Sequence, residues 1–279
     1  MEKSTRSALG ALLQTAQKFG KPVEIVNNST LNQKFGIFDD ILPDPSDDLA
    51  VRYVAIGNGG HKSEIGKDNL ALFNSIPHQP RHTSLYKHMP FIMRPADADL
   101  IAAERVNYRL RKEIMVNGVK YAAYYLRKLD LTTTTPALEY RTTTNGIVTS
   151  TPWEPSLDDL NPTAPLVNPN QVMTTGDDYI AASARVPLVF NAAETAELIN
   201  VATLLYGNPG YAIVSEVGLC SGVDRMVSGS FNGNAMNYTE AIGVQINDFL
   251  ATLFVAPFQT NGVTIDLDAG SVEPLLVLS

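Results

Sequence analysis

The histidines are the residues whose type could most directly support catalysis or metal binding in this chain. Four are present, at His61, His78, His82 and His88. Two of them, His78 and His82, stand four residues apart, which is the spacing of two metal ligands on one face of a helix. Pro77 and Pro80 make a regular helix there unfavourable, and no HExxH pattern or cysteine accompanies the pair. The sequence therefore predicts no metal site and favours loop histidines at a subunit contact.

A nucleophile or a cofactor loop is equally hard to find. The glycines of GNGGHK, residues 57–62, match neither the GxxxxGK[ST] phosphate loop nor the GxGxxG dinucleotide fingerprint. The single cysteine, Cys220, lies in an expected strand with no histidine near it in sequence, which favours a buried, inert thiol. Residues 227–231, VSGSF, lack the first glycine of a GxSxG nucleophile elbow. We therefore predict no catalytic residue and no cofactor.

Aspartates gather at two places where they could attract a cation. Five lie in the loop of residues 36–50, and Asp266 and Asp268 lie in TIDLDAG. Neither place has the ligand order of a calcium loop. A solvated acidic segment is the simpler interpretation of the loop.

The strongest chemical signal is a basic, tyrosine-bearing stretch, RVNYRLRKEIMVNGVKYAAYYLRKLDL, residues 105–131. Such a stretch could follow a nucleic-acid backbone, but tyrosine and arginine are also the side chains favoured at protein–protein hot spots. The formal net charge of −8 argues against a general nucleic-acid binder, so we interpret the stretch as a protein-binding ribbon. The predicted partner-binding residues are Arg109, Arg111, Lys120, Tyr124, Tyr125, Arg127 and Trp153.

Two Asn-Gly pairs predict the hairpins that would position most of these residues, because Asn-Gly tolerates the positive φ values of a two-residue turn. The turn at Asn117-Gly118 sets Val116 opposite Val119, Ile114 opposite Tyr121, Lys112 opposite Ala123 and Leu110 opposite Tyr125. The turn at Asn145-Gly146 sets Thr144 opposite Ile147 and Thr142 opposite Thr149. We expect a meander, or a long ribbon standing out from the body.

Elsewhere before residue 150, local patterns predict short elements joined by irregular segments. Apolar residues at helical spacing predict an amphipathic helix over residues 5–19, ending at Gly20. A strand is expected over residues 51–56, extended coil over the proline-containing residues 74–95, and two helical turns over residues 97–104.

After residue 150 the pattern changes. Five prolines in residues 151–170 predict a long extended connector. A helix is expected to begin with a capping box, Asn191 to Glu194, and to end at Gly207. A second helix is expected over residues 239–250, a Gly/Asn-rich loop over 228–238, and strands over 184–190, 211–220, 263–268 and 273–279.

The amino-acid composition limits which fold classes and which cellular compartments are expected for this chain. The chain has 279 residues, of which only 18% are charged, against about 25% in ordinary domains. The place of the charged residues is taken by Thr, Asn, Ser, Gly and Pro. This composition favours strands and irregular segments. One cysteine excludes an intrachain disulfide and makes a reducing compartment the default. No signal peptide and no membrane-spanning helix is predicted.

We predict an α+β fold that is β-rich, with long hairpins and extended arms, plus a C-terminal mixed α/β unit with two helices. The expected organisation is an N-terminal region at residues 1–150, the Pro-rich connector at residues 151–170 and the C-terminal unit at residues 171–279.

The lack of catalytic motifs, the single cysteine and the Thr/Asn/Pro-rich arms together resemble virion structural proteins of tailed bacteriophages. The segments SEVGLCSGVDRMVSGSFNGNAMNYTEAIGVQINDFLATLFVAP and VEPLLVLS add to this resemblance. It implies a non-enzymatic component of the tail, neck/collar or baseplate, located in the virion and assembled in the host cytoplasm. Its implied partners are copies of itself, as a homo-oligomer or ring, and other virion proteins, with no membrane and no nucleic acid expected.

Hydrogen bonding leads to the same expectation. Extended arms cannot pair their own backbone groups in a monomer, so neighbouring subunits are expected to supply the partners, and closed rings use one such surface repeatedly. The 105–150 ribbon and the 151–170 connector would be the main contact elements.

Two alternatives remain open. A hydrolase-type enzyme without a recognisable motif predicts a stable monomer with a deep polar pocket, and a nucleic-acid-contacting connector protein predicts binding that falls steeply with salt.

Overall fold

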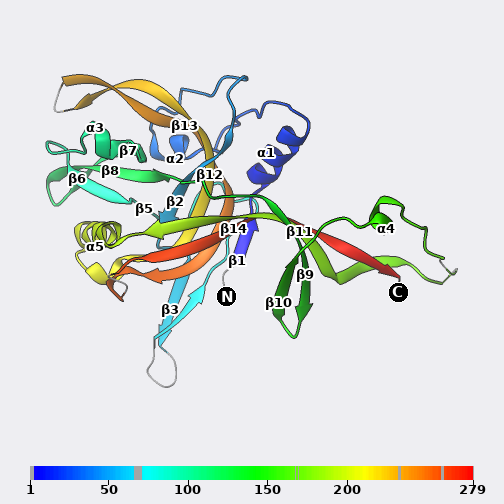
Figure 1. Cartoon of the computed structure of the whole chain (residues 1–279). Coiled ribbons are helices and arrows are strands. Elements are labelled where there is room, and N and C mark those ends of the chain that lie inside the picture. Colours follow the sequence, from blue (N-terminus) through cyan, green and yellow to red (C-terminus); the bar gives the residue numbers. More distant parts are fainter. Residues whose placement is uncertain are drawn as a thin grey trace. The chain divides into compact units, whose positions relative to one another are not determined.

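The chain forms a β-rich α+β protein that divides into two compact units (Figure 1). The computed structural model describes residues 3–65, 71–166, 168, 170–231, 234–258 and 261–278. Unit 1 comprises residues 1–129 and 188–265, and unit 2 comprises residues 130–187 and 266–279. These divisions differ from the predicted ones at residues 150 and 170, because the long strands β11 (Met173–Phe190) and β14 (Val263–Leu278) each continue from one unit into the other.

Unit 1 contains an eight-stranded antiparallel sheet with the order β1-β13-β12-β2-β8-β6, in which β5 also pairs with β2 and β7 with β8. Its strands are β1 (Lys3–Arg6), β2 (Ala50–Gly57), β5 (His88–Met89), β6 (Ile92–Pro95), β7 (Tyr108–Val116), β8 (Val119–Lys128), β12 (Ile213–Phe231) and β13 (Asn234–Val255). Residues 212–223 are all buried. The middle of β12 is therefore covered on both faces.

The second helix predicted for residues 239–250 is wrong, because this segment lies within β13. Residues 240–247 are all buried, and a strand buried on both faces loses the alternation that marks a half-exposed one. The spacing of Ile242, Ile246 and Phe249 then imitates a helix. Residues 228–231 and 234–238, predicted as a loop, belong to β12 and β13, while residues 232–233 lie outside the described residues.

Local signals placed two helices of unit 1 correctly. In α1 (Ala8–Lys18), the Ser7 hydroxyl accepts a hydrogen bond from the backbone N–H of Gly10. In α5 (Ala192–Tyr206), the predicted capping box joins Asn191 and Glu194 through reciprocal bonds of 2.9 and 3.0 Å, and Gly207 ends the helix at φ +69°. The other helical elements are α2 (Leu31–Phe35), α3 (Ala102–Arg105), η1 (Pro209–Tyr211) and η2 (Ala256–Phe258).

Both predicted Asn-Gly turns are confirmed, with positive φ at all four residues. The β7–β8 register sets Val116 opposite Val119, Ile114 opposite Tyr121 and Lys112 opposite Ala123, and the ladder skips Leu110, whose φ is +51°. The second hairpin, β9 (Ala137–Thr144) and β10 (Ile147–Pro152), sets Thr144 opposite Ile147 and Thr142 opposite Thr149. The two hairpins belong to different sheets, so the expected single ribbon is not formed.

Unit 2 is a four-stranded sheet with the order β10-β9-β11-β14, accompanied by the single helical turn α4 (Leu157–Leu160). Among the described residues in the ranges of unit 2, the buried apolar side chains are Ala181, Val186 and Leu267. The sheet is therefore backed by very little core of its own.

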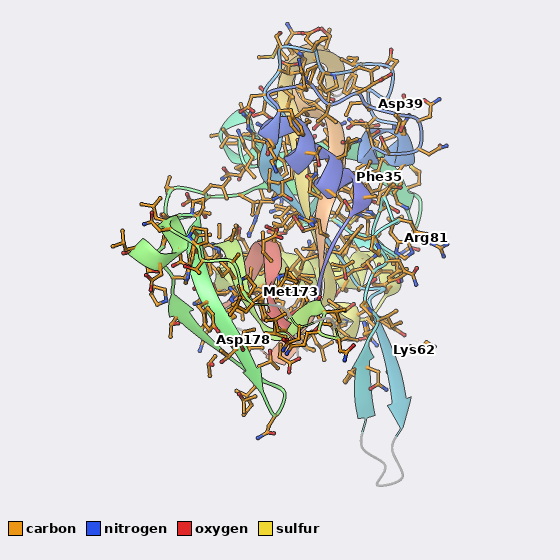
Figure 2. All side chains as sticks on the ribbon, turned by 90° about the vertical axis from the view of Figure 1, so that its right-hand side faces the viewer. Phe35, Asp39, Lys62, Arg81, Met173 and Asp178 are labelled. Atoms are coloured by element: carbon orange, nitrogen blue, oxygen red, sulfur yellow. The ribbon has the colours of Figure 1, made fainter. Side chains whose placement is uncertain are left out.

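A separate two-stranded ribbon, β3 (His61–Ile65) and β4 (Ala71–Ser75), belongs to unit 1 and carries Lys62 (Figure 2). The coil expected over residues 74–95 is present at residues 76–87 and 90–91 only, because residues 74–75, 88–89 and 92–95 lie in β4, β5 and β6. In the part of the chain that is described, no helix has the length and apolar character needed to cross a membrane.

Candidate functional site

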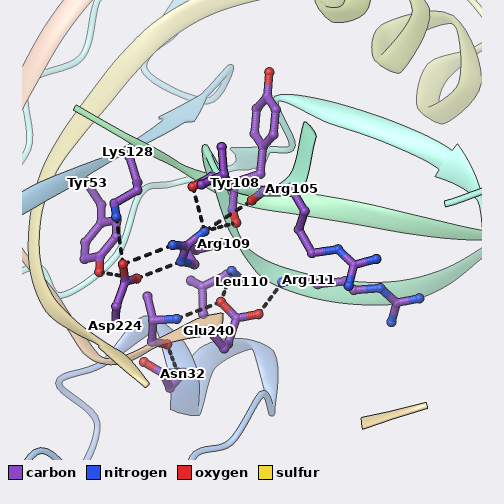
Figure 3. A network of polar contacts seen from close by, with 12 residues as sticks. Asn32, Tyr53, Arg105, Tyr108, Arg109, Leu110, Arg111, Lys128, Asp224 and Glu240 are labelled. Carbon is purple, nitrogen blue, oxygen red and sulfur yellow. Dashed lines mark hydrogen bonds and ion pairs between the residues drawn. The ribbon is translucent and has the colours of Figure 1, made fainter. Parts of the chain in front are cut away.

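Three carboxylates of unit 1, those of Asp99, Asp224 and Glu240, bind the β7–β8 hairpin through its basic side chains or its backbone N–H groups. Figure 3 shows the contacts of Asp224 and Glu240. Two of these acids come from the long β12–β13 pair and the third from the segment before α3. The hairpin is thus held at several points along its length by side chains from distant parts of the sequence.

Asp224 is the centre of the first cluster. Arg109 donates to both carboxylate oxygens, from Nε at 2.7 Å and from Nη2 at 3.0 Å. Lys128 Nζ donates at 2.7 Å and the Tyr53 hydroxyl at 2.8 Å. Burial acts to raise the pKa of Asp224, but the bonds from Arg109, Lys128 and Tyr53 together hold this pKa well below its usual value. The carboxylate is therefore firmly ionised and bound on both oxygens.

Glu240 is a buried carboxylate, 1% exposed, that receives backbone donors. It accepts from the N–H groups of Leu110 at 2.6 Å, Arg111 at 3.0 Å and Ala241 at 2.8 Å. The left-handed conformation of Leu110 removes its N–H from the ladder and leaves it free for this bond. Burial raises the pKa of Glu240, and the three N–H donors offset part of that rise.

Asp99 anchors the third cluster. Arg111 Nε donates to it at 2.7 Å, the Tyr124 hydroxyl at 2.8 Å and the backbone N–H of Leu100 at 2.7 Å. Arg105 lies farther away, with 3.7 Å between Nη2 and the carboxylate. Burial, followed by the charge of Asp99, raises the pKa of Tyr124 and keeps this phenol protonated.

Arg127 ties the same hairpin to α5. It forms an ion pair with Glu194 and donates to the Val189 carbonyl at 2.8 Å. Its guanidinium lies over the rings of Phe91 and Phe190, at 5.2 and 4.9 Å from their centroids. Glu194 therefore serves both the helix cap and this ion pair.

A second polar cluster surrounds Glu216 of β12, whose side chain is fully buried. Its carboxylate accepts from the backbone N–H groups of Gly59, Tyr86 and Lys87 at 2.8–2.9 Å and lies 2.8 Å from Nε2 of His78. The His78 ring is stacked between Tyr86 and Phe249, each 4.2 Å away. This cluster fixes the irregular segment of residues 76–87 against β12.

The two histidines with ligand-like spacing do meet, since Nδ1 of His78 lies 3.1 Å from Nδ1 of His82. Within the described residues, no three His, Cys, Asp or Glu side chains are grouped so that they could hold a metal ion. Cys220 is buried, and burial raises the pKa of its thiol, which keeps it protonated.

These clusters are arranged for holding the fold. A general base must reach a proton on a substrate, whereas the carboxylates of Asp99, Glu216 and Glu240 are buried and accept hydrogen bonds from their own chain. Buried charges that are paired and hydrogen-bonded in this way specify one geometry for the strands that carry them.

The predicted partner-binding residues fall into two groups. The side chains of Arg109, Arg111, Tyr124 and Arg127 are at most 10% exposed and are bound to acids of the same chain. In this structure their polar groups are used within unit 1, on both faces of the hairpin.

The other three predicted residues lie differently. Lys120 is 58% exposed and pairs with Glu113 at 3.1 Å. Tyr125 is half-buried and stacks on Phe35 with 4.3 Å between ring centroids. Trp153 belongs to unit 2, where it is half-buried and its backbone N–H donates to the Leu138 carbonyl.

The acids of the clusters were missed at the sequence level. Glu216, Asp224 and Glu240 stand within or beside apolar runs that form strands. A charged residue inside an apolar strand is almost never fully buried without a partner, so it predicts a cation or a set of donors elsewhere in the chain. For Asp224 and Glu240 these partners come from the β7–β8 hairpin, and for Glu216 they are His78 and backbone N–H groups of residues 59, 86 and 87.

The chain belongs to DUF7208, a family of unknown function, which it matches over residues 1–279. No curated protein and no solved structure gives a significant match to the sequence or the fold.

Proposed function

We propose that this chain is a non-enzymatic structural subunit of a multi-protein assembly, acting through subunit–subunit contacts. The assembly we propose is a tailed-phage virion, in its tail, neck or baseplate, put together in the host cytoplasm. The virion assignment is supported by the sequence resemblance alone, whereas the assembly role has support from the described residues.

The observation that carries the assembly role is the exposed apolar surface of unit 2. Its exposed apolar side chains include Leu138, Ile147, Val148, Leu157, Leu160, Leu166, Val272, Leu276 and Val277. A single four-stranded sheet with three buried apolar residues has little to stabilise it, and monomeric proteins rarely leave large contiguous apolar patches open to water. Contacts with neighbouring subunits would cover these side chains.

The contact elements differ from those expected from sequence. The charged side chains of β7–β8 are used inside unit 1, so we assign the contacts to the β9–β10 hairpin and to the connector that follows it. In β10 every side chain is exposed, none is charged, and Ile147 is 68% exposed. Natural sheets usually protect an edge strand of this kind with charges or bulges.

Sedimentation velocity over a range of concentrations tests the assembly role. We expect wild-type protein to form a ring or a concentration-dependent oligomer, and Ile147→Ser to lower its mass. Leu12→Ser in α1, which removes a 45% exposed leucine of unit 1, serves as the matched control and should leave the mass unchanged. A wild-type monomer at every concentration would contradict the proposal, and absence of the chain from purified particles, measured by mass spectrometry, would contradict the virion assignment.

The two alternatives gain no support from the described residues. The His78–Glu216 pair is too enclosed to serve a hydrolase as it stands, and the arginines of β7–β8 are paired with acids instead of forming an open basic face. DNA binding measured at two salt concentrations would reveal the connector role if it exists.

A further inference from the structure

Unit 1 contains a pocket of about 240 Å³ between α3 and the β12–β13 pair. Apolar side chains form its rim, including Val106, Met226 and Met236, and Tyr238 also lines it. Val106 is 56% exposed and Met226 is 65% exposed. Methionines are adaptable side chains that recur on protein-binding surfaces.

Arg105 brings an incompletely bonded positive charge to this pocket. The residue is 7% exposed, and its Nε has no hydrogen-bond partner among the described residues. Its Nη2 donates to the Leu100 carbonyl at 2.9 Å, and Nη1 donates to the weak acceptor Sδ of Met236 at 3.6 Å. The guanidinium also lies over the Tyr238 ring, 5.4 Å from its centroid. The nearest carboxylate, Asp99, is 3.7 Å away and is already bound by Arg111 and Tyr124.

The two charged side chains that line the pocket, those of Arg105 and Arg109, are both cations. Arg109 is paired with Asp224 through two hydrogen bonds, so Arg105 is the cation at the pocket that has no close carboxylate of its own. An apolar rim with a spare guanidinium suits a ligand that combines an apolar side chain with a carboxylate.

The chain itself exposes a segment with this chemistry. In α4 of unit 2, Leu157 is 73% exposed and Leu160 is 76% exposed, and the turn has no buried residue. Asp158 lies between the two leucines and is exposed. Asp159 accepts bonds from the N–H and hydroxyl groups of Ser156, which hold the turn in shape. The segment is therefore a preformed acidic and apolar turn without a place in its own unit.

We propose that α4 of one copy of this chain docks into the pocket of another copy. This inference rests on the proposed assembly role and names its partner as a second copy. A leucine of α4 enters the pocket between Met226 and Met236, and Asp158 faces Arg105. A pocket of this volume has room for one leucine side chain.

Such a contact is heterologous, since one patch meets a different patch, and it therefore generates a ring or an open filament. A single helical turn covers far less than the roughly 1,200 Å² of a stable interface. Each contact alone is weak, and assembly depends on its repetition around the ring and on the β10 edge.

Disulfide trapping between separately purified chains tests the docking. The one native thiol, Cys220, is buried and does not interfere. Leu157→Cys protein carrying a size tag is mixed with untagged Met226→Cys protein under mild oxidation, and a crosslinked heterodimer is expected. In the control, Leu12→Cys replaces Met226→Cys, because Leu12 is also an exposed apolar side chain of unit 1 and is similar in size to methionine. The control should give several-fold less heterodimer.

The outcomes separate this inference from the assembly role. If sedimentation shows assembly while the Leu157–Met226 heterodimer does not exceed the Leu12 control, the docking is wrong and the assembly role stands. If the wild-type chain is a monomer throughout, both fail. As an independent check, Leu160→Ser and Met226→Ser should each weaken association by about tenfold, as expected for an anchor side chain in a pocket, and unchanged association would overturn the docking.

Discussion

Units 1 and 2 both contain antiparallel strands and an Asn-Gly turn, but they differ in which side chains they bury and which they expose. Unit 1 buries charges, such as Glu216 and Glu240, and provides donors for them from its own chain. Unit 2 exposes apolar side chains, such as Ile147 and Leu276, and buries few. Unit 1 thus provides partners for its buried charges from its own chain, whereas unit 2 has little buried core among its described residues.

The largest expected effect is on the carboxylate that unit 1 depends on most. Glu216→Gln replaces an acceptor of three backbone N–H groups and of His78 with an amide that can accept at one oxygen only. We expect the free energy of unfolding to fall by about 3–5 kcal/mol, measured by denaturant titration.

The matched control is Glu197→Gln, which removes a partly exposed partner of Arg94 in the same unit. This substitution should cost under about 1 kcal/mol. Equal losses for the two variants would mean that the buried cluster is no more important than a surface ion pair.

A pH dependence of about 3 kcal/mol is expected from Asp248 of β13. Burial raises its pKa to about 6, and Arg6 only partly offsets this. Because the pKa of the folded chain exceeds the unfolded value of about 3.9, Asp248 contributes most to stability below pH ~4, and this contribution is lost as the pH rises to about 6.

Asp248→Asn should therefore raise stability at pH 7 relative to wild type, by about 3 kcal/mol, and should flatten the change between pH 4 and pH 7. Thermal unfolding across this range provides the measurement, with Asp266→Asn, an exposed aspartate of unit 2, as the control. A wild-type profile retained in Asp248→Asn would show that another group titrates.

The smallest effect compares the two units directly. Gly118 and Gly146 occupy equivalent turns at φ +80° and +77°, and a Cβ at either one meets nothing within 4 Å. Replacing either glycine with alanine should cost about 1 kcal/mol through backbone strain alone.

Hydrogen exchange shows where each loss appears. In Gly118→Ala we expect faster exchange throughout β7–β8 with lower stability of unit 1, and in Gly146→Ala faster exchange confined to β9–β10. If Gly146→Ala instead lowers the protection of β12 and β13, the two units unfold as one.

Much of the local structure could be predicted from the sequence. Three features depend on residues that are at most a few positions apart: the Asn-Gly turns, the register that each turn sets, and the capping box of α5. Short sequence patterns are therefore enough to predict them. The candidate site was predicted only in part. The basic residues of β7–β8 were identified, but Asp224, Glu240 and Glu194 lie about 70 to 130 residues farther along the chain than their partners, and Asp99 precedes Arg111 by 12 residues.

By itself, the sequence determined where the two Asn-Gly hairpins turn, where α5 begins and ends, that a helix lies within residues 5–19, and that the protein is β-rich. These features follow from backbone preferences and from hydrogen bonds between neighbours. Only the tertiary structure decided that residues 239–250 form a strand and that the arginines of the tyrosine-bearing hairpin face inward. The reason is that burial on both faces of β13 removes the alternation of apolar and polar residues that marks a half-exposed strand. In addition, whether a charged side chain points inward depends on where its partner, distant in sequence, lies in the fold.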